Sequence, residues 1–234
     1  MQAKNQPKPL KKEKIIIFGI GEIADLAHFY LGHDSPHKVV AFSVDKEFLP
    51  KEKKHLGLPV IDFAEIEKHF SPKKFSMFLP ISFRNVNKIR EKKYFEAKQK
   101  GYRLISYVSS KATVWADLKT GDNCFIFEDN TIQPFVKIGN NVIMWSGNHV
   151  GHHTTIKDHC FITSHVVISG HVVVEPNCFL GVNSTIRDNI KIAKESVIGA
   201  GAIITKDTVE KGVYYAAGAN ILKTEGSSAE LKKI

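Results

Sequence analysis

The 234-residue chain lacks the features that would place it in a membrane or outside the cell. No apolar run approaches the ~18 residues that span a bilayer. Residues 1–14 are polar and rich in lysine, without the apolar core of a secretory signal. Cysteine is scarce, and we expect Cys124, Cys160 and Cys178 to be buried fillers rather than disulfide partners. These absences predict a cytoplasmic protein with no membrane insertion.

A clustered basic face is also missing, although the formal net charge is +9. Five lysines and one glutamate give residues 1–14 a charge of +4, and the remaining lysines are spread along the chain. Nucleic-acid binding needs a concentrated basic surface with aromatic or polar readers, so we expect no nucleic-acid partner. A modest positive balance suits anionic small molecules such as nucleotides and coenzyme A.

The chain does contain a long six-residue repeat, from Ile126 to Ile204. Large aliphatic residues fill fourteen consecutive sixth positions: Ile126, Ile132, Ile138, Met144, Val150, Ile156, Ile162, Ile168, Val174, Leu180, Ile186, Ile192, Ile198 and Ile204. Helices repeat near 3.6 residues and strands near 2, so neither produces this period, whereas a hexapeptide β-helix does. Small residues often stand two places earlier. We interpret the glycines that follow some aliphatic positions (Gly139, Gly151, Gly181 and Gly199) as corner residues with positive φ.

Before the repeat, strands and helices alternate in the pattern of a small parallel α/β sheet. We expect strands at 15–18, 38–44, 59–63, 75–81 and 102–108, and helices at 24–31, 64–70 and 86–100. The chain therefore divides into a flexible tail (1–13), a Rossmann-like domain (14–108), a β-helix (109–205) and a C-terminal cap or tail (206–234).

Candidate ligand residues follow the strands of the α/β domain. Gly19 and Gly21 form a Gly-rich turn between the first strand and helix, and Asp45 follows the second strand. Ser82 and Arg84 begin the loop after the strand at 75–81. Strand ends that share an edge form the usual ligand crevice of such sheets. From these residues alone, a tight turn that binds nothing and a solvated Arg84 remain open.

Histidines gather in the β-helix, where six of the eleven lie within 23 residues: His149, His152, His153, His159, His165 and His171. The last four are six apart, so each occupies the same point on a successive face, and His153 should lie above His171. None holds an inward position, so we expect all six to face outwards. They could serve as polar contacts between subunits, as ligands of a transition metal, or as a general base.

The hexad array, the preceding α/β domain and the segment from Asn148 to His153 together resemble the left-handed β-helix sugar acyltransferases. Within that family the chain is most similar to bacterial nucleotide-sugar (UDP-4-amino-sugar) N-acetyltransferases and sialic acid O-acetyltransferases. The resemblance extends from Lys14 to about Lys223. It implies a homotrimer without a metal, in which acetyl-CoA lies between adjacent prisms. The implied reaction acetylates the amino group of a nucleotide-linked amino sugar for cell-surface glycan biosynthesis.

The resemblance also assigns roles to individual residues. His152 would be the base, with His149 as the alternative, and a backbone amide near Gly170 would steady the oxyanion. His153 stands where an acid often orients the base, so Asp158 or an acid of the next subunit would take that role. The implied cofactor contacts are Phe161, Gly170, Val182, Gly199 and Ala200. The implied nucleotide-sugar contacts are Gly19, Gly21, Asp45, Ser82 and Arg84.

Three alternatives remain at this stage. An O-acetyltransferase acting on sialic acid or another sugar would share the fold and the base. An inactive trimeric scaffold would keep the fold alone. A carbonic-anhydrase-like β-helix would hold a metal with histidines, but its His-x-x-x-x-His pair is absent from this cluster.

Overall fold

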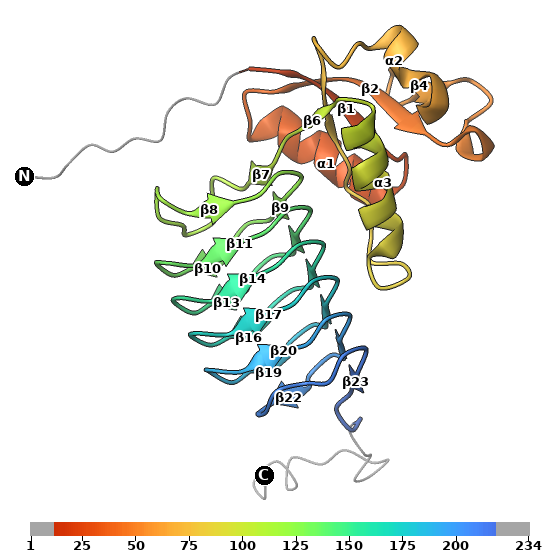
Figure 1. Ribbon diagram of the computed structural model, residues 1–234. Coiled ribbons are helices and arrows are strands. Elements are labelled where there is room, and N and C mark those ends of the chain that lie inside the picture. The colour runs from red at the N-terminus through yellow and green to blue at the C-terminus, as the bar shows by residue number, and fades with distance from the viewer. Residues whose placement is uncertain (1–11, 219–234) are drawn as a thin grey trace, which may run out of the picture.

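The computed structural model describes residues 12–218, in which a small α/β domain stands at one end of a three-sided β-helix (Figure 1). Residues 1–11 of the predicted tail and residues 219–234 of the predicted cap lie outside the described residues. None of the helices within residues 12–218 combines the length and apolar character needed to cross a bilayer. The predicted fold class, a Rossmann-like sheet followed by a β-helix, is confirmed.

The α/β domain is built on a six-stranded sheet with the order β3-β4-β2-β1-β5-β6. Its strands are β1 (Lys14–Phe18), β2 (Lys38–Val44), β3 (Lys54–His55), β4 (Leu58–Asp62), β5 (Ser76–Phe78) and β6 (Arg103–Leu104). Its helices are α1 (Glu22–His33), α2 (Ile66–His69) and α3 (Lys88–Gln99), with 3-10 turns η1 (Lys46–Phe48) and η2 (Phe63–Glu65). All pairings are parallel except β3 with β4, as the buried apolar runs of β1 and β2 predicted.

The strand predicted over 102–108 is wrong, because the chain changes sheets within it. Strand β6 ends the α/β sheet at Leu104, and β7 (Tyr107–Val108) pairs with β9 (Phe125–Ile126) of the β-helix. The backbone N–H of Tyr107 donates to the carbonyl of Cys124 at 2.8 Å. Strand β7 therefore pairs with the β-helix, although the predicted border between residues 108 and 109 assigned it to the α/β domain.

Three parallel sheets form the faces of the β-helix. The first face contains β10 (Thr131–Ile132), β13 (His149–Val150), β16 (Val167–Ile168), β19 (Thr185–Ile186) and β22 (Ile203–Ile204). The second contains β8 (Lys119–Thr120), β11 (Lys137–Ile138), β14 (Thr155–Ile156), β17 (Val173–Val174) and β20 (Lys191–Ile192). The third contains β7, β9, β12 (Ile143–Met144), β15 (Phe161–Ile162), β18 (Phe179–Leu180), β21 (Val197–Ile198) and β23 (Val213–Tyr214).

The six-residue repeat predicted the interior of this prism. Each of the fourteen aliphatic positions is the second residue of a two-residue strand, and none is more than 6% exposed. Partners in neighbouring coils are eighteen residues apart, as in the pairing of Ile132 with Val150 and of Val150 with Ile168. The three cysteines are free and fully buried between the coils, as predicted.

The interpretation of the glycines is wrong, because the left-handed corners lie elsewhere. Positive φ occurs three residues after the aliphatic position, as at Asn141 (57°) and His153 (60°), whereas Gly139 and Gly151 have no positive φ. A Cβ atom on Gly151 would lie 2.5 Å from the backbone nitrogen of Gly170 in the next coil. Glycine is therefore required here by the close approach of the coils, not by backbone conformation.

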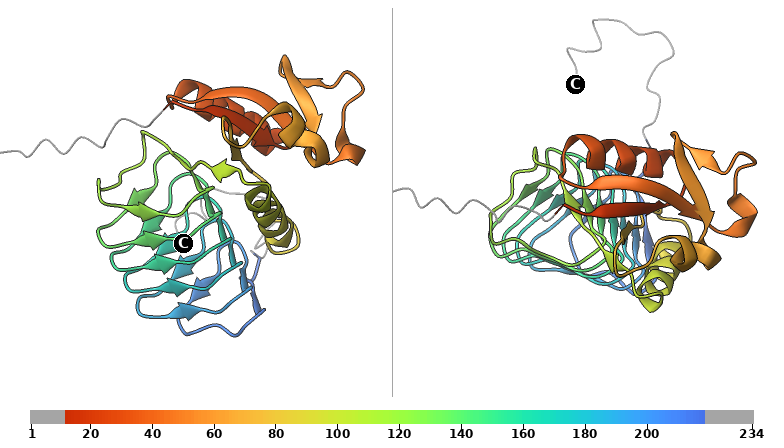
Figure 2. Two further views of the ribbon diagram at one scale, coloured as in Figure 1. Left: turned by 45° about the horizontal axis from the view of Figure 1, so that its top comes forward. Right: turned by 90° about the horizontal axis from the view of Figure 1, so that it is seen from above.

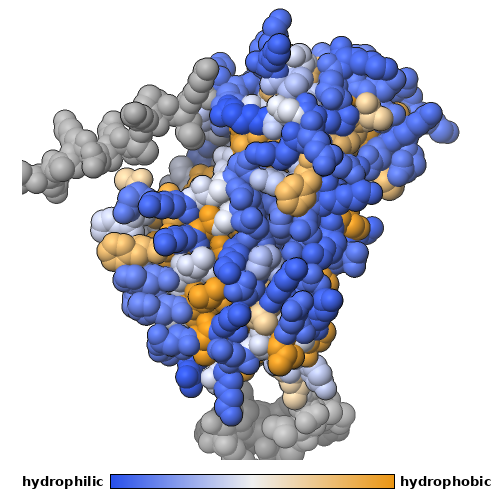
Figure 3. All heavy atoms as spheres, viewed as in Figure 1, coloured by the Kyte–Doolittle hydropathy of each residue, from blue (hydrophilic) through white to orange (hydrophobic). Residues whose placement is uncertain are grey.

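The outward residues give the three faces different surfaces. The outward residues of the third face are apolar. The α/β domain covers Phe125, Ile143 and Phe161 of this face, and these side chains are at most 2% exposed. Those of the second face include Lys119, Lys137 and Lys191. Those of the first face carry no acidic, lysine or arginine side chain: Thr131, His149, Val167, Thr185 and Ile203. Figure 3 shows hydrophilic residues over most of the side turned to the viewer, with apolar residues interspersed on the coils.

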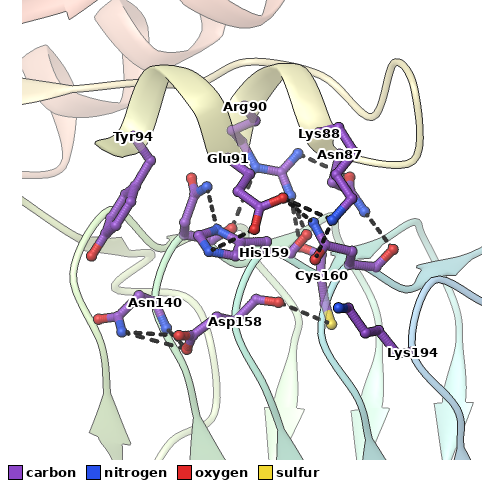
Figure 4. A network of polar contacts seen from close by, with 12 residues as sticks. Asn87, Lys88, Arg90, Glu91, Tyr94, Asn140, Asp158, His159, Cys160 and Lys194 are labelled. Carbon is purple, nitrogen blue, oxygen red and sulfur yellow. Dashed lines mark hydrogen bonds and ion pairs between the residues drawn. The ribbon is translucent and has the colours of Figure 1, made fainter. Parts of the chain in front are cut away.

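Helix α3 of the α/β domain lies along the side of the prism, as both views of Figure 2 show. Arg90 is fully buried and donates hydrogen bonds of 2.9–3.3 Å to six oxygen atoms (Figure 4). Three acceptors are corner carbonyls of the β-helix, from Asn141, His159 and Cys160. Burial lowers the pKa of Arg90 to about 9, so the guanidinium stays charged at neutral pH.

A column of polar side chains lies beneath α3, one from each successive coil. Asn123 donates to Asn141 Oδ1 at 2.8 Å, and Asn141 Nδ2 lies 2.8 Å from Nδ1 of His159. His159 is only 4% exposed, and its Nε2 lies 3.8 Å from Glu91 of α3. The prediction that all six histidines face outwards is therefore wrong for His159, because the α/β domain covers its corner.

We expect Arg90→Met to lower the free energy of unfolding by about 3 kcal/mol or more, because several buried carbonyls would lose their donor. Lys92→Met, on the exposed side of α3, is the matched control and should change it by about 0.5 kcal/mol or less. Urea denaturation measures both. Equal small effects would show that the Arg90 network does not hold the two domains together.

Stability should also depend on pH through His159. Burial lowers the pKa of His159 despite the neighbouring Glu91, so the folded chain keeps this imidazole neutral. Below about pH 6.5 the unfolded state binds the proton more readily, and stability falls as the pH falls. Thermal unfolding at pH 7.5 and 5.5 should show a smaller loss for His159→Asn than for the unchanged chain. His165→Asn, at an exposed corner, is the control, and an unchanged loss in His159→Asn would contradict this account.

Candidate active site

His152 lies at the corner between the first and second faces, after β13 and before β14. Its backbone N–H donates to Gln133 Oε1 at 2.8 Å, and its side chain is exposed. Its Nδ1 lies 3.1 Å from Nδ1 of His153. An exposed imidazole can exchange protons with a bound molecule, which is the property that a general base needs.

Gly170 lies beside His152, one coil further along the prism. A Cβ atom on Gly170 would lie 3.0 Å from Cε1 of the His152 ring. The absence of a side chain at Gly170 therefore makes room for the imidazole. Within residues 12–218 the backbone N–H of Gly170 donates no hydrogen bond.

His153 and His171 stack as the repeat predicted, with ring centroids 4.8 Å apart and planes 9° from parallel. Both have left-handed φ, at 60° and 57°. Desolvation lowers the pKa of His153, and repulsion from the charged forms of His171 and His152 lowers it further. The pKa of His153 therefore lies below the ordinary histidine value, beside the candidate base.

Asp158 does not orient His152, so this prediction is wrong for a single chain. Its Oδ1 accepts a hydrogen bond from the backbone N–H of Asn140 at 2.7 Å, at the corner between the second and third faces. Among the described residues no carboxylate forms an ion pair with His152. His149 lies on β13 and points outwards from the first face, half-buried.

The sheet order brings the predicted nucleotide-sugar residues to one edge. Strand β1 lies between β2 and β5, so Gly19, Asp45 and the loop containing Ser82 all follow neighbouring strands. Gly19 has φ of 110°, and Gly21 caps α1. Lys93 of α3 donates to Asp45 at 2.7 Å, and the carbonyl of Ser82 accepts from Arg90.

The predicted cofactor residues other than Gly170 lie at two other places on the prism. Val182, Gly199 and Ala200 occupy the corner between the third and first faces, where Val182 is 42% exposed. Phe161 is buried on the third face, where its ring packs against Phe83 at 5.2 Å. Phe161 therefore packs against the α/β domain and does not lie beside His152. The outward residues of this face directly precede every third aliphatic position, so they are eighteen residues apart in the sequence. Their shared apolar character could have predicted this apolar face from the sequence.

The candidate base and the predicted cofactor residues of the later coils thus lie at opposite edges of the first face. His152 and Gly170 lie at one corner, and Val182 and Ala200 lie at the other. A single chain does not bring these two groups together. Two prisms packed side by side could do so, because a corner of one would then face a corner of the next.

Sequence comparison identifies part of the repeat. Residues 171–206 match the model for the hexapeptide repeat of succinyl-transferase. Comparison with curated proteins gives no significant match.

Solved structures share the fold over most of the chain. PerB from Caulobacter crescentus, in complex with CoA and GDP-perosamine, is 22% identical with a TM-score of 0.75, covering 87% of this chain and 94% of that one. The acetyltransferase domain of PglB from Neisseria gonorrhoeae is 19% identical with a TM-score of 0.74, covering 87% and 97%. WeeI from Acinetobacter baumannii is 16% identical with a TM-score of 0.71, covering 89% and 97%.

These similarities confirm the predicted resemblance at the level of the fold, in both the α/β domain and the coils. The chain has the two-domain, left-handed β-helix fold of the hexapeptide-repeat sugar acyltransferases.

Proposed function

We propose that the chain is an acyltransferase that moves the acetyl group of acetyl-CoA to the amino group of a nucleotide-linked amino sugar. The observation that carries this proposal is the exposed imidazole of His152 beside Gly170, in a fold shared with sugar N-acetyltransferases. The complexes of the Caulobacter proteins with CoA and GDP-perosamine support the choice of both substrates.

In the proposed reaction, the amine attacks the thioester carbonyl directly. His152 accepts a proton from the nitrogen as the C–N bond forms, and the negative charge collects on the carbonyl oxygen. In this proposal, the backbone N–H of Gly170 donates a hydrogen bond to that oxygen. The C–S bond then breaks, and the CoA sulfur leaves as the thiol after receiving the proton.

The distribution of residues supports assembly with a second prism. The first face has no acidic, lysine or arginine side chain pointing outwards, and Val167 and Ile203 on it are 39% and 71% exposed. A homotrimer packed through this face would place Val182, Gly199 and Ala200 of one chain near His152 of the next. Acetyl-CoA would then lie between the prisms, and an acid of the neighbouring subunit could orient His152.

The acceptor would bind at the carboxyl edge of the α/β sheet. Gly19 and Gly21 provide a turn at the start of α1 where backbone amides can meet a phosphate. Asp45 and Ser82 follow neighbouring strands and offer polar groups to a ribose or base. Arg84 is exposed in the same loop as Ser82 and can pair with a phosphate. A cytoplasmic location and a role in cell-surface glycan biosynthesis belong to the same proposal.

Thiol release from acetyl-CoA, measured against a panel of UDP-, dTDP- and GDP-linked amino sugars, tests this function. We expect turnover with one acceptor and a loss of ~10² or more in His152→Ala, because the general base is removed. His165→Asn is the matched control and should retain turnover. Full activity in His152→Ala would reject His152 as the base, and turnover only with hydroxyl acceptors would favour O-acetylation.

A further inference from the structure

The corner that carries His152 brings three imidazoles together. One ring nitrogen from each of His152, His153 and His171 lies within 4.8 Å of the other two, and all three side chains are exposed. His152 comes from the same turn as His153, and His171 comes from the next coil. Family resemblance implies no metal, but this arrangement has the donor atoms of a metal site.

One separation in the cluster already matches that of two ligands on a tetrahedral ion. Two imidazole nitrogens bound at about 2.0–2.1 Å to one tetrahedral zinc ion lie about 3.4 Å apart. Nδ1 of His152 and Nδ1 of His153 already lie 3.1 Å apart. The His171 ring stacks on that of His153 at 4.8 Å, so the His171 ring would have to rotate out of this stack to supply a third nitrogen, and water would complete the coordination.

The backbone holds the ligands in place. The N–H of His171 donates to the carbonyl of His152 at 2.9 Å, which fixes the spacing between the two coils. Gly170 leaves open the space that the His152 ring occupies. No carboxylate among residues 12–218 forms an ion pair with these imidazoles. Imidazole nitrogens select zinc, nickel, copper or cobalt over magnesium and calcium.

We propose that His152, His153 and His171 form a binding site for one divalent transition metal ion of the zinc type. Because the ligands are exposed and lack carboxylate partners in the described chain, we expect weaker metal binding than in sites whose histidines donate to carboxylates. The ion would occupy a ring nitrogen of His152 and prevent it from accepting a proton. This inhibitory effect rests on the proposed function, whereas binding of the ion does not.

Zinc binding to the full chain, stripped of metal beforehand, tests the proposal by competition with a chromogenic chelator. We expect one zinc ion per chain in the unchanged protein and a loss of affinity of about 100-fold or more in His171→Asn. Asparagine already occupies equivalent left-handed corners at Asn183 and Asn189, so this change should preserve the fold. His165→Asn, an exposed corner outside the cluster, is the matched control and should bind zinc normally.

No binding to the unchanged protein, or equal binding by His171→Asn and His165→Asn, would overturn the site. The acyl-transfer assay gives a second readout, in which zinc should inhibit the unchanged protein and His165→Asn at lower concentration than it inhibits His171→Asn. Equal inhibition of all three would overturn the inhibitory role. If no acceptor supports turnover, the proposed function fails, but the direct binding result still decides the metal site.

Discussion

The structure depends on the stacking of coils at a spacing of eighteen residues. Backbone hydrogen bonds join each coil to the next, and one aliphatic side chain from each face fills the interior. Because inward residues tolerate no charge and the coils tolerate no side chain at Gly151, the register cannot shift by even one residue. Each outward position consequently recurs every eighteen residues, so equivalent side chains form columns along the outside of the prism.

Histidines in two of these columns differ in burial, and therefore in the role that each can have. His159 stands in the column that α3 covers, where burial keeps it neutral and hydrogen-bonded to Asn141. His153 and His171 have the same left-handed backbone but stand in an uncovered column, beside His152. Histidines at the same position of the six-residue repeat are therefore buried at one corner of the prism and exposed as a cluster at another.

Most of the fold could be predicted from the residues themselves. The hexads predicted all fourteen inward positions, and the stacking of His153 on His171 followed from their spacing of eighteen. The candidate site was predicted less completely. The proposed base His152 and Gly170 do lie together, whereas Asp158 and Phe161 lie in other parts of the molecule. The positions of Asp158 and Phe161 depend on which corner and which face each occupies.

The sequence by itself determined the repeat, the strands of the coils and the turn at Gly19, because these depend on local periodicity and backbone preferences. Only the tertiary structure decided which of three chemically similar corners is covered, since that depends on where the α/β domain packs. Arg90 illustrates the reason. It lies in a lysine-rich helix, and the orientation of α3 buries it against six oxygen atoms, including carbonyls of coils fifty to seventy residues away. Contacts over such distances have no signature in a sequence window.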